Sequence, residues 1–99
     1  MRELKVQIIR FVDACQPGVV ECEFRDANKQ LHYVIDKVPI FTNLLLWSDS
    51  HYPQPGTVQC EILEQTFEEN GRIVVKITTV ESTRGETEFW IDESELIDG

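Results

Sequence analysis

The dominant pattern along this chain is an alternation of apolar and polar residues, which has the period of a β-strand. The first alternating stretch covers residues 3–12, where polar side chains separate Leu4, Val6 and Ile8. Similar stretches follow, and each predicts a strand with one set of residues facing a core. These sets are Val20, Cys22 and Phe24; Leu31, Tyr33 and Ile35; Val58, Cys60 and Ile62; Ile73, Val75 and Ile77; and Thr87, Phe89 and Ile91.

Short polar turns separate the predicted strands. The clearest is Glu68-Glu69-Asn70-Gly71, because an Asn-Gly pair tolerates the positive φ angles of a tight hairpin. Residues 26–29 predict a second hairpin, between the strands that contain Phe24 and Leu31. Residues 16–18 and 82–85 give two further turn signals.

The segment from Pro39 to Gly56 breaks the alternation. A short helical turn is expected over residues 40–47, with Asn43 as its N-cap. A rigid turn is expected over residues 52–56, because two prolines fix φ there. Near the C-terminus, Asp92-Glu93-Ser94-Glu95 has the pattern of a capping box and predicts a one-turn helix.

The predicted strands fit within 99 residues, which is the size of one domain, so residues 1–99 are expected to form a single small β-barrel domain. A half-buried sheet needs a second layer, and no predicted helix is long enough to provide it. The sheet must therefore curl onto itself, which also protects its edge strands. The predicted fold class is all-β: a small six-stranded, mostly antiparallel barrel or curved sandwich with one or two short helical turns.

The charge of the chain argues against several classes of partner. Its 18 acidic and 9 basic residues give a net charge of −9, and the basic residues are scattered singly. Nucleic-acid binding depends largely on Lys and Arg contacts to phosphates, so we expect no nucleic acid and no anionic membrane. The charge is compatible with a basic protein partner, and equally with solubility alone. No apolar run could cross a membrane and the charged N-terminus does not resemble a signal peptide, so a cytoplasmic protein is expected.

No residue pattern indicates catalysis, a cofactor or a metal. The cysteines have no CxxC spacing, and Cys22 and Cys60 fall on core-facing positions, where we expect them to act as small apolar residues. His32 alternates outward and is expected at the surface. His51 follows Ser48-Asp49-Ser50, but neighbours in sequence seldom converge as a catalytic triad, so a solvated loop is expected. We therefore expect no enzyme activity, no catalytic or metal-binding residues and no cofactor.

The outward-facing positions form a second pattern. If the sets above face inward, a belt of carboxylates lies outside, made of Glu21, Glu23, Glu61, Glu88 and Asp92. The same face would carry Val34, Leu63, Val74 and Trp90. Large exposed apolar patches are uncommon on monomers, so we expect the 40–47 segment and the C-terminal turn to cover these residues. An uncovered Trp90 would instead be an aromatic anchor with an acidic rim, which suits protein binding.

Two more aromatic residues, Trp47 and Tyr52, lie in the long stretch that does not alternate. Connections of this length often carry function. We expect both aromatic residues to pack into the mouth of the barrel, and partner binding is the alternative.

Several segments together resemble a known group of proteins. They are Lys37-Val38-Pro39-Ile40-Phe41, Tyr52-Pro53-Gln54-Pro55-Gly56, Cys60-Glu61-Ile62-Leu63, Asn70-Gly71-Arg72 and Glu88-Phe89-Trp90-Ile91. In this order they look like small acidic bacterial β-barrel proteins of uncharacterised function, over most of the chain. The resemblance implies a small barrel and assigns no functional residues. In size and acidity such proteins are similar to immunity proteins that neutralise bacterial toxins.

The leading functional hypothesis is a non-enzymatic acidic interaction domain that binds a basic protein, with an immunity-type toxin inhibitor as its most specific form. Its predicted partner-binding residues are Trp90, Glu88, Asp92, Glu21, Glu23, Glu61, Trp47 and Tyr52. The alternative is a small-molecule-binding β-barrel, with the 40–56 loop as a lid and His51 at its mouth beside the two loop aromatics. A nucleic-acid-binding barrel ranks below both because of the charge. Oligomeric state and strand order are left open.

Overall fold

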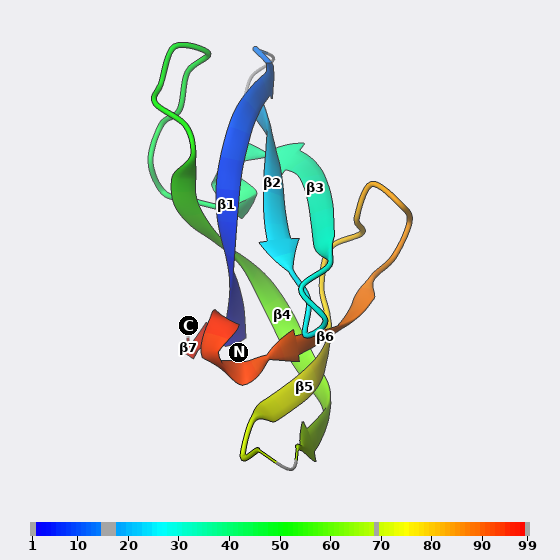
Figure 1. The fold of residues 1–99 in the computed structure, drawn as a ribbon. Helices are drawn as coiled ribbons and strands as arrows, with labels where there is room; N and C mark the ends of the chain where they lie inside the picture. The colour runs from blue at the N-terminus through cyan, green and yellow to red at the C-terminus, as the bar shows by residue number, and fades with distance from the viewer. Residues whose placement is uncertain (1, 15–17, 69, 99) are drawn as a thin grey trace.

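The computed structural model describes residues 2–14, 18–68 and 70–98, which form seven β-strands and two 3₁₀ turns (Figure 1). The strands are β1 (Arg2–Asp13), β2 (Val19–Arg25), β3 (Leu31–Lys37), β4 (Gln54–Phe67), β5 (Ile73–Thr78), β6 (Glu88–Asp92) and β7 (Leu96–Asp98). The 3₁₀ turns are η1 (Val38–Ile40) and η2 (Glu93–Glu95). The six predicted strands are all present, and β7 is an addition that the alternation did not predict.

The strands form one antiparallel sheet in the order β3-β2-β1-β4-β5-β6, and β7 pairs with β1. The sheet curls strongly into a half-barrel (Figure 1), which confirms the predicted all-β fold class. β1 has β4 on one side, and β2 and β7 share its other side at opposite ends. Because β7 pairs with the start of β1, the two ends of the described chain lie side by side (Figure 1).

β4 joins the two parts of the sheet. Its first half, up to Cys60, pairs with β1, and its second half, from Glu61, pairs with β5. Pro55 lies in the first half, where β5 does not pair with β4, so its missing N–H leaves no gap in a ladder on that side. The rigid turn predicted over residues 52–56 is therefore wrong in its second part, because the strand already begins at Gln54.

The hairpin of β4 and β5 extends beyond the packed body of the protein, at the bottom of Figure 1. The predicted Asn-Gly turn closes it, with Gly71 at a φ of +82°. A register shift lies between Ile62 and Glu64, and the described β4 residues from 61 onward are exposed. Phe67 keeps 69% of its surface exposed. Ile62 lies opposite the buried Ile77 and so points to the core side of the sheet as predicted, but it stays 36% exposed because the hairpin extends beyond the packed body here.

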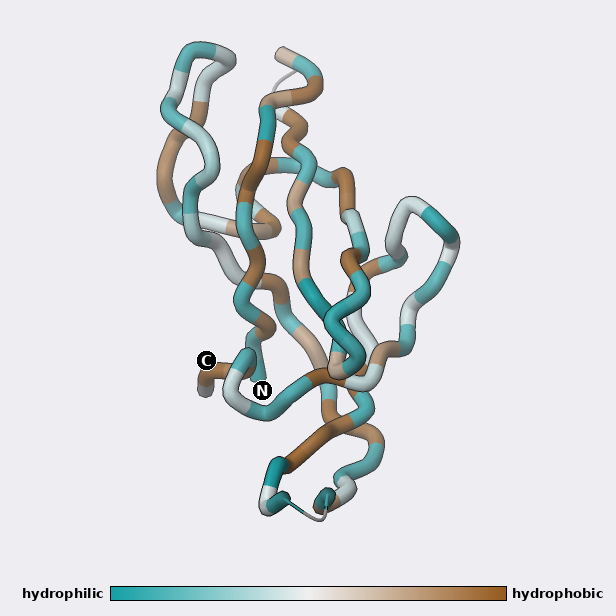
Figure 2. Tube along the Cα trace, in the orientation of Figure 1, coloured by the Kyte–Doolittle hydropathy of each residue, from teal (hydrophilic) through white to brown (hydrophobic). Residues whose placement is uncertain are grey.

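The core fills the concave side of the half-barrel. Its fully buried side chains are Leu4, Ile8, Val20, Cys22, Val34, Val58, Val75, Ile77 and Ile91. Figure 2 shows the alternation of hydrophilic and hydrophobic residues along the strands that supply them. Cys22 and Cys60 are buried free thiols, which confirms that they act as small apolar groups. Thr87 departs from its predicted set, because β6 begins one residue later and Thr87 is exposed.

The register of β3 is opposite to the predicted one. His32 and Val34 face the core, with His32 only 5% exposed, whereas Ile35 is exposed. Pairing with β2 explains the difference, because Val34 lies opposite Cys22 and His32 lies opposite Phe24. Directly opposed residues in antiparallel strands point to the same side of the sheet. The predictions of a surface His32 and an outward Val34 are therefore wrong.

The two edges of the curled sheet meet along a seam that loops close. In the β2–β3 turn, the Ala27 N–H donates to the Trp90 carbonyl of β6 at 2.7 Å. In the loop over residues 79–87, the Thr83 N–H donates to the Tyr33 carbonyl of β3 at 2.8 Å. Aromatic rings from β2, β3 and β6 pack beneath these contacts. We use the word seam for this meeting of β3 and its preceding turn with β6 and its preceding loop.

The helical elements among the described residues are two short 3₁₀ turns, η1 and η2. The helical turn predicted over residues 40–47 is wrong: η1 ends at Ile40, and the Leu44 N–H donates to Thr42 Oγ1 in an irregular loop. At the other end, Asp92 caps η2 as predicted, and its carboxylate accepts the Ser94 N–H at 3.0 Å. In the part of the chain that is described, no helix has the length and apolar character needed to cross a membrane.

Candidate functional site

The eight residues predicted to bind a partner lie in three separate places on the outside of the half-barrel. Glu61, Glu88, Trp90 and Asp92 share the outer face of β4, β5 and β6, which we call the β4–β6 face. Glu21 and Glu23 lie on β2, and Trp47 and Tyr52 lie in the loop between β3 and β4. The carboxylates lie outside the core as predicted. They do not form one belt, because β1 separates β2 from β4.

Three cross-strand rows build the β4–β6 face. Residues that are directly opposite in antiparallel strands have neighbouring side chains on one side of the sheet. The rows are Glu61–Thr78–Glu88, Glu64–Lys76–Trp90 and Thr66–Val74–Asp92. Trp90 therefore lies in the middle row, between two of the predicted acidic residues.

Carboxylates in these rows have cationic partners. Lys76 Nζ lies 3.2 Å from Glu88 Oε1 and 3.7 Å from Glu64 Oε2. Arg72 Nε donates to Asp92 Oδ2 at 2.6 Å. Exposed ion pairs of this kind contribute at most about 1 kcal/mol each to stability. Their main effect here is to fix the positions of the charged groups around the indole and to reduce the local excess of negative charge.

Trp90 is partly exposed, so the expectation that the 40–47 segment and the C-terminal turn cover it is wrong. It is 39% exposed, and its backbone contact is with the β2–β3 turn. Two hollows border its side chain. One, of about 240 Å³, is also lined by Ala27 and Val74, and the other, of about 280 Å³, is also lined by His32. Val74 points outward as predicted but is buried.

Arg72 holds the seam closed beside the indole. Its Nη2 donates to the Ala27 carbonyl at 2.6 Å, while its Nε binds Asp92. Together with the hydrogen bond from the Ala27 N–H to the Trp90 carbonyl, these contacts hold the β2–β3 turn against the free edge of β6. The backbone that carries the indole is therefore ordered in advance, which lowers the entropy lost when a partner binds.

Asp92 is predicted to make stability depend on acid pH. The Ser94 N–H and the Arg72 guanidinium stabilise its carboxylate and lower its pKa from 3.8 to about 2. A carboxylate whose pKa is lower in the folded state stabilises the fold above its unfolded pKa, and this gain is lost as the pH falls through the folded value. Asp92→Asn, which keeps a capping oxygen, should therefore lose about 1 kcal/mol at pH 7 after allowance for solvent screening. Between pH values of about 4 and about 2, the free energy of unfolding of the variant should fall by less than that of the wild type, as measured by urea unfolding.

Asp49→Asn is the matched control for this prediction, because Asp49 is exposed in the loop between β3 and β4. Its free energy of unfolding at pH 7 should equal that of the wild type. Equal losses in the two variants at pH 7 would refute a specific role for Asp92.

The β2 carboxylates form a separate candidate. Arg10 Nε donates to Glu21 Oε1 at 2.6 Å, and the Glu21 side chain is 16% exposed. Glu23 is half-buried between Gln7 of β1 and Tyr33 of β3. Glu21 and Glu23 are both partly covered, whereas Glu61 and Glu88 are exposed, so β2 offers less carboxylate surface to a partner than the sequence pattern indicated.

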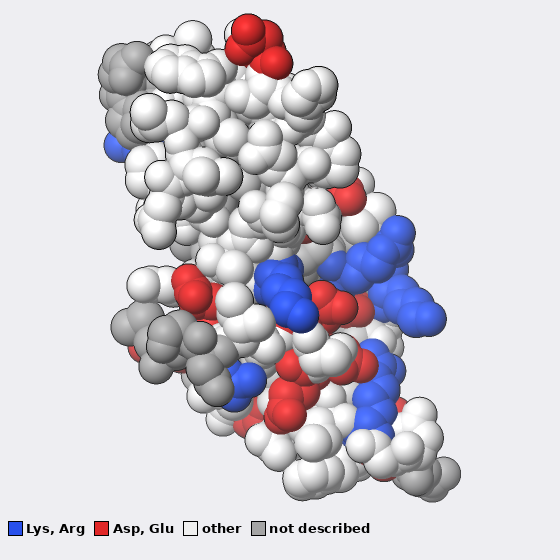
Figure 3. Space-filling model, turned by 90° about the vertical axis from the view of Figure 1, so that its left-hand side faces the viewer, with Lys and Arg blue, Asp and Glu red and all other residues white. Residues whose placement is uncertain are grey.

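The loop over residues 41–53 is the third place. Trp47 is 57% exposed, whereas Tyr52 packs against the core and donates its hydroxyl to the Trp47 carbonyl at 2.7 Å. Burial raises the pKa of Tyr52. The prediction that both aromatic residues pack into the mouth of the barrel is therefore wrong for Trp47. Residues 38–60 contain Asp49 as their only charged residue, and charged side chains accordingly gather in the lower half of the face shown in Figure 3.

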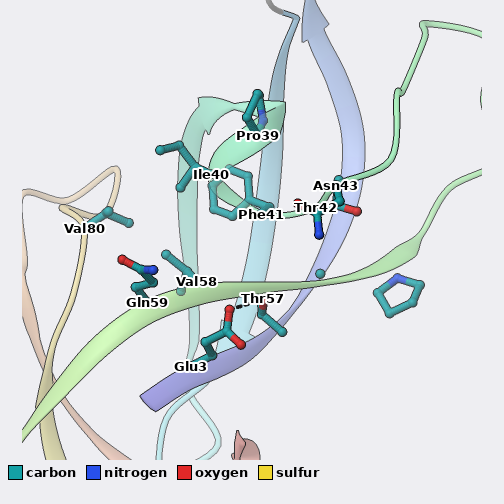
Figure 4. A pocket seen from close by; sticks show the side chains of 12 residues that line it. Glu3, Pro39, Ile40, Phe41, Thr42, Asn43, Thr57, Val58, Gln59 and Val80 are labelled. Carbon is teal, nitrogen blue, oxygen red and sulfur yellow. Dashed lines mark hydrogen bonds between the residues drawn. The ribbon is translucent and has the colours of Figure 1, made fainter. Parts of the chain in front are cut away.

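Two larger hollows border the start of this loop. One, of about 730 Å³, lies between residues 39–43 and residues 55–59 of β4 (Figure 4), where Thr57 Oγ1 donates to Glu3 Oε1 at 3.1 Å. The other, of about 840 Å³, is lined by Phe11 and by residues 42–49 among others. Exposed residues line much of both hollows, and buried side chains fill the interior of the half-barrel.

A buried histidine at the seam is the functional detail that the alternation missed. His32 Nε2 lies 2.8 Å from Asp26 Oδ2, and the ring packs against phenylalanines of β2 and β6. Its Nδ1 is buried and has no hydrogen-bond partner. Burial raises the pKa of Asp26, but hydrogen bonds from His32 and from the N–H groups of Gln30 and Asn28 outweigh it and lower the pKa overall. The Asp26 carboxylate therefore stays ionised and accepts a hydrogen bond from the Nε2–H group of His32.

The other residues weighed for chemistry lie apart from this seam. His51 is exposed in the loop, where its carbonyl accepts the Gln54 side-chain amide at 2.8 Å. Cys15 and most of the turn predicted at residues 16–18 lie outside the described residues. Within residues 2–14, 18–68 and 70–98, no group of three or more His, Cys, Asp or Glu side chains is placed to hold a metal ion.

Comparison with protein-family models, with curated proteins and with solved structures found no match. The resemblance to small acidic bacterial barrels is therefore supported only for the fold, which is a small, curled, antiparallel all-β sheet. Function has to be argued from the residues of the site itself.

Proposed function

We propose that this chain is a non-enzymatic interaction domain that binds a basic protein through the β4–β6 face, with Trp90 as the anchor. The main support is a partly exposed indole between two hollows on a preordered strand edge. Tryptophan is enriched at binding hot spots, particularly where it can pair with a partner's side chains in adjoining pockets. The net charge of −9 favours the approach of a cationic partner.

The charges around the indole support the same partner. Carboxylates outnumber cations among the residues that line the two hollows: Asp26, Glu68, Glu86 and Glu88 against Lys76 and Arg84. A basic surface can therefore meet uncompensated negative charge at this face. An immunity-type inhibitor of a basic toxin is the most specific form of the proposal, and it predicts a tight complex that salt weakens.

The small-molecule alternative has less support from the geometry. A ligand-binding barrel normally encloses its ligand, whereas this interior is filled by buried side chains. The two larger hollows lie beside the 41–53 loop, and exposed residues line much of both. Of the predicted residues, Trp47, Tyr52, Glu21 and Glu23 lie away from the β4–β6 face, and we leave them out of the primary binding surface.

Trp90→Ala is expected to remove most of the partner affinity. Immobilised wild-type chain, exposed at low salt to an extract of its source cells, should retain a basic protein that mass spectrometry identifies and that can be titrated. The variant should bind that protein at least about 30-fold more weakly, the usual effect of losing a hot-spot tryptophan. Wild-type affinity should also fall at least about tenfold between low and high salt, because charge steers and supports the contact.

Trp47→Ala is the control, because it removes an exposed indole from the loop over residues 41–53, away from the β4–β6 face, and should leave the affinity within about twofold. Retention of no basic protein at low salt would contradict the proposal. So would equal affinity of the Trp90→Ala and wild-type chains.

A further inference from the structure

The hollow of about 280 Å³ beside Trp90 contains a buried polar atom without a partner. We call this hollow the seam groove; His32, Glu86, Glu88, Arg84 and Trp90 are among the residues that line it. His32 is only 5% exposed, and its Nδ1 has no hydrogen-bond partner. Buried polar atoms nearly always have partners, and an unpaired one is destabilising, so the atom indicates a group that the free chain lacks.

The Asp26 carboxylate determines what kind of group this is. Because Asp26 Oδ2 lies 2.8 Å from Nε2, the ring proton belongs on Nε2, and the second nitrogen of a neutral imidazole is then an acceptor. The nearest charged oxygen, Glu86 Oε1, lies 3.9 Å from Nδ1, which is too long for a hydrogen bond between them. When the ring is neutral, Nδ1 and the Glu86 carboxylate are therefore two acceptors 3.9 Å apart, one neutral and one anionic.

We infer that the seam groove binds a cationic N–H donor side chain, arginine or lysine, of the basic partner; this inference rests on the proposed function. A single nitrogen about 2.9 Å from each acceptor can satisfy both, because the acceptors are only 3.9 Å apart. Trp90 lines the same groove, and an indole binds guanidinium and ammonium groups favourably. The groove thus combines two acceptors with an aromatic wall.

Other occupants fit less well. An anion would meet Asp26, Glu86 and Glu88 against two cations. Among the described residues the histidine and carboxylates do not form a metal-binding group. Lys76 is already held by Glu88 and Glu64. Arg84 is the remaining cation of the groove, and its positive charge should oppose an incoming cation.

The test is a titration of the free chain with N-acetyl-arginine amide and, separately, N-acetyl-lysine amide, followed by NMR of ring nitrogens. Uncharged N-acetyl-norleucine amide is the control ligand. We expect saturable shifts of His32 Nδ1 and of the Trp90 indole N–H, with a Kd of about 1–10 mM for at least one cationic ligand. His51 and Trp47, exposed elsewhere, are internal controls and should not shift in step.

Two substitutions make the test specific to the groove. Glu86→Gln should weaken binding at least about fivefold, whereas Glu95→Gln, which removes the same charge from η2, should change it less than about twofold. Arg84→Gln should tighten binding about two- to fivefold, because it removes a repelling charge. A purely structural role of these side chains would not produce opposite effects.

Shifts that do not saturate, or that occur equally with the norleucine ligand, would overturn the inference and leave the groove to solvent. The proposed function would survive that result if Trp90→Ala still abolished capture of a basic protein. The converse result is saturable binding of the arginine or lysine ligand without capture of a basic protein. It would refute the proposed function, and the cation that the groove binds would then not come from a basic protein partner.

Discussion

Replacement of Phe89 by alanine is expected to lower the free energy of unfolding by about 3–5 kcal/mol. The Phe89 ring is buried beneath the seam, with its centroid 5.0 Å from that of Phe24 in an edge-to-face contact and 4.8 Å from that of His32. Alanine would leave a cavity between strands that the hydrogen-bonded sheet cannot fully close. Urea unfolding followed by circular dichroism gives the free energy of unfolding directly.

Phe67→Ala is the matched control for this loss. It deletes the same ring from the end of the β4–β5 hairpin, where the side chain is 69% exposed, and should change stability by less than about 0.5 kcal/mol. If both variants lost the same amount, the rings beneath the seam could not be close-packed. The seam groove would then lack the rigid wall that the binding proposal requires.

Alternation predicted the fold where only one of the two sets in a strand was apolar. In β1, Leu4, Val6 and Ile8 alternate with charged or amide side chains, so only one register buries the apolar set. The same holds for Val20 and Cys22 of β2, whose alternate positions are glutamates. Because such strands leave one favourable choice, local sequence was sufficient to orient them.

β3 could not be oriented in this way. Leu31, Tyr33 and Ile35 form one set, but His32 and Val34 form another set that can also be buried, since the hydrogen bond to Asp26 offsets part of the cost of burying the histidine. The register of the hairpin with β2 decides between them, by placing His32 opposite Phe24. That register depends on the five residues of the turn between the strands, which the apolar pattern does not describe.

β4 shows a second limit of local pattern. Its alternation continues to Ile62, yet from Glu61 onward the strand has left the core and pairs only with β5. Burial therefore depends on where the body of the protein ends, and this is set by the lengths of all the strands together. The register shift after Ile62 is likewise a property of the strand pair and not of one strand.

The candidate site could be predicted in its residue types but not in its arrangement. The sequence placed Trp90 between Glu88 and Asp92, and the structure places all three on the β4–β6 face. It could not show that Arg72 and Lys76 compensate nearby acids, because those cations become neighbours only through strand pairing. The seam closes through contacts between residues far apart in sequence, so the groove beside Trp90 has no local signature.

The thiols of Cys22 and Cys60 are expected to be almost unreactive in the folded protein. Burial, with a smaller contribution from the Glu21 carboxylate, raises the pKa of the Cys22 thiol from 9.0 to about 12. Burial also raises the pKa of Cys60. Only the thiolate is alkylated, and the rise at Cys22 lowers its thiolate fraction at pH 8 by roughly 1000-fold, before access to the reagent is considered.

Iodoacetamide labelling of a Cys15→Ser variant at pH 8 measures this, because Cys22 and Cys60 are then the only thiols. Mass spectrometry should find labelling of Cys22 at least roughly 1000-fold slower in buffer than in concentrated urea, which exposes both side chains, and labelling of Cys60 should also be slower in buffer. Glu21→Gln should leave the buffer rate almost unchanged, because burial is the larger cause of the raised pKa. Rapid labelling in buffer would mean that the thiols face solvent, and this would reverse the register of β2 and β4 on which the outward position of their glutamates depends.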